Sequence, residues 1–415
     1  MKNFYDFKVD NIKGLSVQEK EFRNKELDLF SKYGFPNKKD EAWKFTDLNT
    51  ILSKNFTNIT NDYISLKEKK FELIKEFDHN YLFVLDGKLI SNEFNFEDKN
   101  KVIIKEYDYK NQIPVSNQNS LNLLNNALAT GGYCLEISED YKFKKPLVVY
   151  NHFSKSIKEQ IISYKNSLIL NQNSELTIFN HTDTNSKNNF FVNSFDYLKL
   201  KKDSNLKNIF INNDRCNCYF HNYLKSDLEK NTNFDNFILS SGLKFNKIDI
   251  EINLNEEHAR SSIFSALSLG SEEHQEIKSS INHNFKNCQS YQKIKNVLND
   301  QSRGVYQGKI FVKQDAQKTD AYQLSKALLL NDNAEFDAKP ELEIYADDVK
   351  CSHGSSSGSI DAEAIHYLMT RGIDLQNAKK LLINGFLNEI FENIPEDKIR
   401  TFLEKSIAVQ IDEIR

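Results

Sequence analysis

Glycine and proline are scarce in this chain, with 13 and 5 copies among 415 residues, which argues against a collagen-like or low-complexity interior. None of the glycines forms the phosphate-binding pattern G-x-x-x-x-G-K-[ST] or the dinucleotide-binding pattern G-x-G-x-x-G. H-E-x-x-H is absent as well, whereas G-x-S-x-G occurs once, at Gly354–Gly358. The sequence therefore predicts that this chain does not hydrolyse ATP, has no Rossmann-type site and is not a zincin.

Cysteine is also rare, and its five copies are irregularly spaced, at Cys134, Cys216, Cys218, Cys288 and Cys351. Such a set is not a disulfide framework, so we expect a reducing compartment. The first residues lack the apolar stretch of a secretory signal, and no run approaches the roughly 18 apolar residues of a membrane span. We therefore expect a cytoplasmic protein with no membrane partner.

Neither sign of charge dominates, because 55 Lys and Arg against 59 Asp and Glu leave a net charge of -4 and a pI near 6.2. A chain without an excess of positive charge is not expected to bind nucleic acid. Hydrophobic residues make up 39% of the chain and aromatic residues 12%, which suffices for a substantial core. The length fits two or three domains, or one elongated repeat domain.

The N-terminal region carries the signals of a helix over residues 17–33. Ser16 and Glu19 form a capping-box pattern at its start, and Gly34 is suited to end it. The apolar and aromatic residues of this helix recur at steps of three and four, which predicts one packing face made of Phe22, Leu29, Phe30 and Tyr33.

The last 55 residues are also predicted to be helical. Asp361 or Ser359 can cap a first helix that ends at Gly372, Asp374 can cap a second, and Pro395 can open a third. Because the end coils of a repeat fold need covering, we expect both helical regions to seal the ends of the intervening domain.

Between about 130 and 350 the sequence changes to short alternating runs separated by Asn, Asp and Ser, which predicts strands and turns. Polar turn residues recur every sixteen positions, at Asn299, Asp315, Asn331 and Asp347. A fixed interval of this kind predicts stacked coils, in which each coil buries its inner face against its neighbours. The predicted fold class is therefore mainly β, a β-solenoid flanked by helices.

Two clusters in the solenoid region contain metal-ligand side chains. In Cys216-x-Cys218 a strand would place both thiols on one face and His221 on the other, so the choice is between two ordinary buried thiols and a site of metal-ligand or sulfur chemistry. The triplets Glu256–His258 and Glu272–His274 are either ligands on adjacent coils or solvated surface charges.

A third cluster, Cys351-Ser-His353-Gly354, ends the repeating pattern where the helical tail begins. In an extended chain Cys351 and His353 project to the same side, so an acidified thiol or a soft ligand pair is one interpretation. A packed thiol beside a surface histidine is the other. Two ligands do not complete a metal site, so iron or an iron–sulfur cluster would need further ligands from another chain or from sulfide.

At these residues the chain resembles the SufB/SufD family, the scaffold proteins of the SUF iron–sulfur cluster assembly system. The resemblance is carried by Tyr306–Ile310, Pro340–Gly354 and Tyr367–Ile373, together with Gly34–Pro36 and Asp40–Leu48 near the N-terminus. These stretches cover about a third of the chain. Its length, its N-terminal element and the Cys-Ser-His-Gly motif look like the SufD branch rather than the longer SufB branch.

The resemblance implies a right-handed parallel β-helix over 116–355, between an N-terminal helical and mixed region, 1–115, and a C-terminal helical domain, 356–415. It also implies a SufB-like partner at an edge of the β-helix and a SufC-like ABC ATPase on the C-terminal helices, with ATP bound by SufC only. A nascent iron–sulfur cluster would be held transiently between this chain and SufB. The resemblance further associates a flavin with the whole complex. A homodimer is an alternative when SufB is absent, because an open sheet edge can pair with its own copy.

Carried over residue by residue, His353 is implied to lie at the interface with SufB and to act as a transient iron or cluster ligand, with Cys351 beside it. The implied contacts with SufC fall in one short stretch, at Tyr367, Leu368, Arg371, Gly372 and Ile373. The expected function is that of a non-catalytic scaffold subunit. Two alternatives stay open: a purely structural arm with all cluster chemistry on SufB, and a polysaccharide-processing β-helix enzyme.

Overall fold

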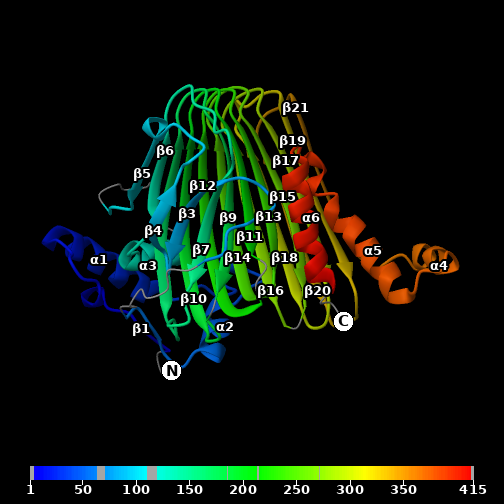
Figure 1. The fold of residues 1–415 in the computed structure, drawn as a ribbon, viewed down its shortest axis with the longest axis horizontal. Coiled ribbons are helices and arrows are strands. Elements are labelled where there is room, and N and C mark those ends of the chain that lie inside the picture. Colours follow the sequence, from blue (N-terminus) through cyan, green and yellow to red (C-terminus); the bar gives the residue numbers. More distant parts are fainter. Residues whose placement is uncertain are drawn as a thin grey trace.

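The computed structural model describes residues 4–62, 71–109, 119–184, 186–212, 215–270 and 272–412. Two facing sheets of mostly parallel strands form a β-solenoid of about eight turns, with helices at the N-terminal and C-terminal parts of the chain (Figure 1). The predicted fold class, mainly β with a solenoid core, is therefore confirmed.

Successive strands of the solenoid alternate between the two sheets, so from β8 to β19 each strand pairs with the strands two before and two after it. The nine-stranded sheet contains, in chain order, β5 (Val102–Glu106), β6 (Tyr133–Ile137), β8 (Ile161–Leu170), β10 (Phe190–Leu200), β12 (Cys216–Leu228), β14 (Leu243–Leu254), β16 (His274–His283), β18 (Arg303–Val312) and β20 (Glu335–Ile344). The ten-stranded sheet contains β3 (Asn80–Leu85), β4 (Lys88–Glu93), β7 (Leu147–Phe153), β9 (Glu175–Thr184), β11 (Asn205–Asn212), β13 (Asn233–Ser241), β15 (Arg260–Leu269), β17 (Gln289–Leu298), β19 (Thr319–Leu329) and β21 (Val349–Gly358). The short strands β1 (Tyr5–Asp6) and β2 (Ile59–Thr60) pair with each other.

The helices are α1 (Val17–Tyr33), α2 (Leu48–Asn55), α3 (Ser120–Leu128), α4 (Ala362–Thr370), α5 (Leu375–Asn388) and α6 (Asp397–Asp412). The predicted starts are confirmed where a cap defines them, because the Glu19 backbone N–H donates to the Ser16 hydroxyl, and Asp361 and Asp374 accept from the first turns of α4 and α5. The predicted packing face of α1 is wrong in part. Its buried residues are Arg23, Glu26 and Phe30, whereas Tyr33 is 71% exposed.

The sixteen-residue spacing corresponds to half a coil, one strand and its turn. Asn331 donates a side-chain hydrogen bond of 3.1 Å to Asn299, its counterpart one full coil earlier. The proposed adjacency of the two Glu-Glu-His triplets is therefore wrong. Because β14 and β16 pair with Phe245 opposite His274, Glu272–His274 lies at the start of this strand pair and Glu256–His258 beyond its end.

The interior of the solenoid is apolar over most of its length. Alternate side chains of each strand point between the sheets, such as Ile248, Ile250, Ile252 and Leu254 of β14, and they pack with their counterparts from the facing sheet. Since each coil covers the inner residues of the next, the core is continuous along the stack.

In the part of the chain that the structure describes, the N-terminal helices and helices α5 and α6 cover the outer faces of the two sheets, and no helix seals an end of the solenoid, which corrects the predicted end-capping role. N-terminal residues, among them Trp43 and Leu121, pack on Phe191 and Phe245 of the nine-stranded sheet. Helices α5 and α6 lie on the ten-stranded sheet, against β15 and β17 (Figure 1). Among the described residues, no helix combines the length and the apolar character that a membrane span requires.

The two ends of the solenoid differ. At the first coil, each sheet finishes with an antiparallel strand, β4 against β3 and β5 against β6. At the last coil, the sheets finish with the parallel strands β20 and β21, each of which has one strand neighbour within its sheet in the described part of the chain. The backbone groups of the outer edges of these two strands are therefore available for pairing.

Candidate functional site

Cys351 and His353 lie on β21, the last strand of the ten-stranded sheet. They stand in register with Ala321 and Gln323 of β19, whose side chains are 0% and 2% exposed and point into the solenoid. The prediction that the two side chains share one face is therefore confirmed by the register. Because no further coil follows in the described chain, His353 is exposed although its position faces inward.

A polar cluster lies directly behind His353 inside the last coils. Tyr306, which is fully buried on β18, places its hydroxyl 3.1 Å from Oε1 of Gln292 and 3.2 Å from Oε1 of Gln323. Gln323 also donates from Nε2 to the backbone carbonyl of Glu341 on β20, at 3.2 Å. The cluster therefore connects both sheets immediately below the terminal coil.

Gly308 makes room for this cluster. A Cβ atom at this position would come within 2.1 Å of the Tyr306 hydroxyl oxygen and 2.5 Å of Oε1 of Gln323. Gly308 is also in register with Pro340 on β20. The stretches Tyr306–Ile310 and Pro340–Gly354, separate in sequence, therefore meet at the last coils, whereas sequence reasoning had missed Gln292 and Gln323.

The surroundings of Cys351 do not acidify its thiol. Cys351 is half-buried and packs against a small apolar cluster at the base of β21 that includes Ala321 and Leu342. Burial, and next the Asp320 carboxylate, raise the pKa of the Cys351 thiol above its ordinary value. The interpretation of Cys351 as an acidified thiol is therefore wrong for the isolated chain.

His353 has no side-chain hydrogen bond to any residue that the structure describes. Within the described ranges, no three His, Cys, Asp or Glu side chains come together in a group that could hold a metal ion. Cys351 and His353 therefore offer two ligand atoms at most, and any metal held here needs further ligands from elsewhere.

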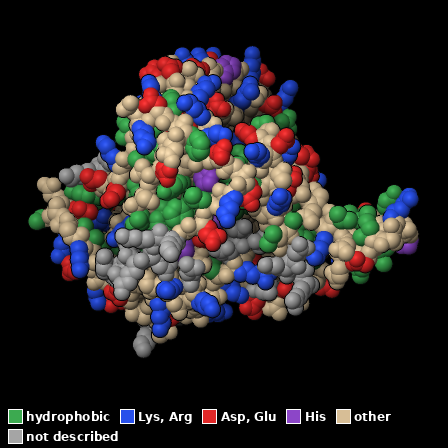
Figure 2. Space-filling view, viewed as in Figure 1, with side chains coloured by type: hydrophobic (Ala, Val, Ile, Leu, Met, Phe, Trp, Pro, Cys, Tyr) green, Lys and Arg blue, Asp and Glu red, His purple; other side chains and the backbone are tan. Residues whose placement is uncertain are grey.

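Helix α4 forms an arm that projects away from the solenoid (Figure 1), and none of its residues is buried. Tyr367 and Met369 are 58% and 45% exposed, and Figure 2 shows hydrophobic side chains gathered on this arm. The guanidinium carbon of Arg371 lies 5.2 Å from the centre of the Tyr367 ring. The predicted contact residues therefore lie together: Tyr367 and Leu368 on α4, and Arg371, Gly372 and Ile373 just beyond it.

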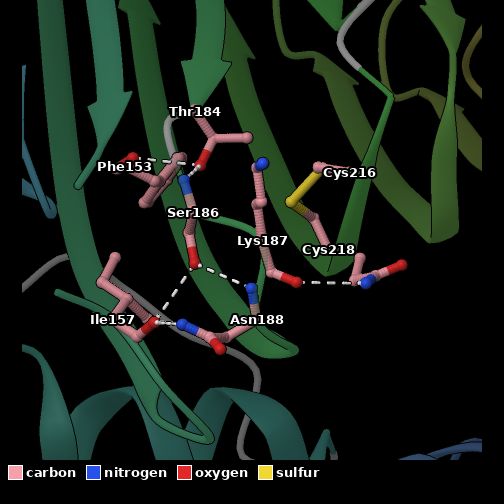
Figure 3. The surroundings of a disulfide bond; sticks show 9 residues. Phe153, Ile157, Thr184, Ser186, Lys187, Asn188, Cys216 and Cys218 are labelled. Atoms are coloured by element: carbon pink, nitrogen blue, oxygen red, sulfur yellow. Dashed lines mark hydrogen bonds between the residues drawn. A yellow bond between two sulfur atoms is a disulfide. The ribbon is translucent and has the colours of Figure 1, made fainter. Parts of the chain in front are cut away.

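Of the two interpretations of Cys216 and Cys218, that of two ordinary buried thiols is wrong, because the structure joins them in a disulfide (Figure 3). His221 is on the opposite face, as expected, and is buried between Asn193 and Asp249. It takes no part in a site with the cysteines.

The fold and the terminal coil together define a β-solenoid protein with two open strand edges and a projecting helical arm. The SufBD core domain of the SUF system for iron–sulfur cluster assembly matches residues 152–386, and the SufBD N-terminal region matches residues 2–149. The chain therefore belongs to the SufBD family, as the sequence motifs predicted.

Curated relatives of the chain point to the SufD branch of this family. The iron–sulfur cluster assembly protein SufD of Escherichia coli is 28% identical over 374 residues, which cover 88% of this chain and 87% of the relative. A SufBD family protein of Synechocystis is 23% identical over 402 residues, 92% of this chain and 88% of the relative. SufD of Bacillus subtilis is 32% identical over 140 residues, which cover 34% of this chain and 32% of the relative.

Proposed function

We propose that this chain is a cytoplasmic, non-catalytic scaffold subunit of the SUF system that pairs with a SufB-like subunit through β20 and β21. The observation that carries the proposal is the terminal coil, where His353 is exposed beside two open strand edges. Edge strands pair readily with another sheet because their backbone donors and acceptors are unsatisfied on one side. A partner seated there would face His353 directly.

A nascent iron–sulfur cluster at this interface would take an imidazole nitrogen of His353 as one ligand and sulfur or nitrogen ligands from SufB. Three features support this role: His353 is exposed, it has no hydrogen bond within the described chain, and it lies on the face that the partner would cover. Cys351, with its raised pKa, is a second ligand only if metal binding displaces its proton.

Helix α4 is the proposed docking element for a SufC-like ABC ATPase. Its side chains are not buried against the solenoid, and its exposed Tyr367 with the stacked Arg371 is the kind of pair that anchors protein interfaces. Helix α5 joins this arm to the ten-stranded sheet, so a force applied to α4 would reach the solenoid. ATP hydrolysis would belong to the ATPase.

The test is to co-express the three subunits in cells that lack other assembly routes and to measure iron and acid-labile sulfide in the purified complex. We expect His353→Ala to leave the complex assembled but nearly empty of cluster. Ser352→Ala, on the opposite face of the same strand, is the matched control and should behave as the wild type. Normal cluster content in His353→Ala would rule out the ligand role.

The alternative, a purely structural arm, makes a different prediction for the same assay. A Cys351→Ala, His353→Ala double variant would then keep full cluster content as long as the three subunits associate. Loss of association in the single variant would instead assign His353 to subunit pairing.

A further inference from the structure

Cys216 and Cys218 are two residues apart at the start of β12, with their Cα atoms 5.2 Å apart. Alternate residues of a regular strand are about 6.6 Å apart. The pairing of β12 with β14 shifts register between Cys216 and Tyr219, and at this irregularity the two Cα atoms are closer than in a regular strand, within the usual range for a disulfide. The local backbone conformation therefore allows a disulfide between two cysteines that are only two positions apart.

The surrounding sheet, and not the bond, holds this backbone in place. The Cys216 backbone N–H donates to the carbonyl of Gly242 at 3.1 Å, and Cys218 stands in register with Phe190 of β10. Asn217, between the cysteines, donates from Nδ2 to the carbonyl of Lys187 at 3.2 Å. A disulfide that closes so short a loop also restricts the unfolded chain very little. A role as a stabilising cross-link is therefore poorly supported.

The two sulfur atoms differ in their access to solvent. Cys218 is 1% exposed and packs among Phe153, Phe190 and Phe220, whereas Cys216 is only partly buried at the margin of this cluster. Figure 3 shows the disulfide between the two cysteines, which stand at the start of β12. An external thiol therefore reaches Cys216 first, and Cys218 is protected from it.

We propose that Cys216 and Cys218 form a reversible dithiol–disulfide couple that exchanges with low-molecular-weight thiols through Cys216. The inference uses the reducing compartment that belongs to the proposed function, because disulfides in such compartments are usually transient and take part in catalysis or redox sensing.

The exchange proceeds in two balanced steps. A thiolate RS⁻ attacks Sγ of Cys216, the bond between the two cysteines breaks, and Cys218 leaves as a thiolate that takes up a proton. A second RS⁻ attacks the sulfur of the attached R group and releases R–S–S–R and the thiol of Cys216. Two R–SH molecules thus give two electrons and two protons to the protein, and the reverse sequence re-forms the disulfide.

The experiment equilibrates the folded, full-length protein alone with mixtures of reduced and oxidised glutathione. After an acid quench, free thiols are labelled with a maleimide and the peptide with both cysteines is quantified by mass spectrometry. We expect Cys216 and Cys218 to convert together between disulfide and dithiol. Cys288, which is fully buried and whose pKa burial raises to about 11, is the internal control and should stay unmodified by glutathione.

Single substitutions separate the roles of the two sulfur atoms. With oxidised glutathione, the Cys218→Ser variant should acquire glutathione on Cys216 about tenfold faster than Cys216→Ser acquires it on Cys218, because only Cys216 is accessible. Equal rates would overturn the proposal. A wild-type pair that stays oxidised in excess reduced glutathione until the protein unfolds would overturn it too, as would a pair that stays reduced in excess oxidised glutathione.

The wild-type titration decides the question even if a serine variant fails to fold. Because it uses the isolated chain, its outcome is independent of whether the chain assembles with SufB-like and SufC-like partners.

Discussion

Lys247 lies beneath the indole ring of Trp43, with its Nζ atom 4.5 Å from the centre of the ring. Both side chains are buried, Trp43 at 3% and Lys247 at 0% exposure, where the N-terminal segment meets the outer face of the nine-stranded sheet. The ammonium group also donates to the backbone carbonyl of Ala42 at 3.0 Å. This contact fixes the segment around Trp43 to β14, more than two hundred residues away.

Removal of the indole ring should therefore loosen the N-terminal segment. We expect Trp43→Ala to lower the free energy of unfolding by about 3 to 5 kcal/mol, the usual cost of deleting a large buried aromatic side chain. Trp43→Phe, which retains an aromatic ring, is the matched control and should cost less. Urea unfolding followed by far-UV circular dichroism measures both, and equal losses would mean that the aromatic face contributes nothing.

The ion pair between Lys247 and Glu276 is fully buried, and Gln307 donates to Glu276 at 2.7 Å. We expect Lys247→Met to cost about 3 to 5 kcal/mol, because it leaves a buried carboxylate without its cation. Adding Glu276→Gln should recover part of this loss. Urea unfolding of the two single variants and the double variant tests this, and a double variant whose loss equals the sum of the single losses would contradict it.

Glu273 should make stability depend on pH. Its carboxylate accepts from the backbone N–H groups of Gly242 and Gly270, at 3.2 and 3.4 Å, yet burial prevails and raises its pKa from 4.5 to about 7. Between these values the folded chain keeps a proton that the unfolded chain has lost, so stability falls as pH rises. The loss is complete above about pH 7 and amounts to on the order of 3 kcal/mol.

Glu273→Gln removes this titration. The difference in unfolding free energy between variant and wild type should therefore shift in favour of the variant from pH 5 to pH 8, as measured by urea unfolding at each pH. The exposed neighbour Glu272 provides the matched control, Glu272→Gln, for which we expect no such shift. A parallel pH profile for Glu273→Gln and wild type would refute the prediction.

Gly308→Ala should disturb the polar cluster behind His353. A methyl group there collides with the Tyr306 hydroxyl and with Gln323, so overpacking should cost about 1 to 3 kcal/mol in a thermal or urea unfolding experiment. Gly358→Ala is the control, because a Cβ at that position meets nothing within 4 Å. Equal stability of Gly308→Ala and Gly358→Ala would contradict the prediction, because it would mean that the polar cluster accommodates the added methyl group.

The arm around α4 should matter for binding and not for folding. Tyr367→Ala and Arg371→Ala should each change the free energy of unfolding by less than about 0.5 kcal/mol, since both side chains are exposed. Each should weaken binding of a SufC-like ATPase by about tenfold or more, measured by calorimetry. Lys405→Ala, an exposed change on α6, is the control, and unchanged affinity in the Tyr367 and Arg371 variants would place the ATPase elsewhere.

Local signals in the sequence predicted the helix starts and the solenoid. Ser16, Asp361 and Asp374 act within a few residues of themselves, so their capping roles are visible without the fold. The Asn299 and Asn331 turns repeat because the coils repeat, but spacing alone did not show that sixteen residues make half a coil. That distinction depends on which strands pair, which only the three-dimensional structure defines.

Features that depend on distant contacts were not predictable in the same way. Arg23 is buried because its guanidinium donates to the carbonyl of Ala127, about a hundred residues later. The spacing of apolar residues along the helix therefore could not predict that Arg23 is buried. The spacing of Cys216 and Cys218 predicted that the two side chains share a face, but it did not predict the shift in register at which their Cα atoms come closer together. Likewise, Gln323 joined the site only once β19 and β21 were in register.

The two sheets stop at the same coil, with β20 and β21 side by side at the finish of the stack. A protein that pairs with the open edges of β20 and β21 at the same time must itself present two strand edges, one in each of two facing sheets, at the same separation. A single hairpin or a helix would cover one strand edge and leave the other exposed to solvent. The geometry of this end therefore favours the end of a second β-solenoid as a binding partner, whatever chemistry the interface supports.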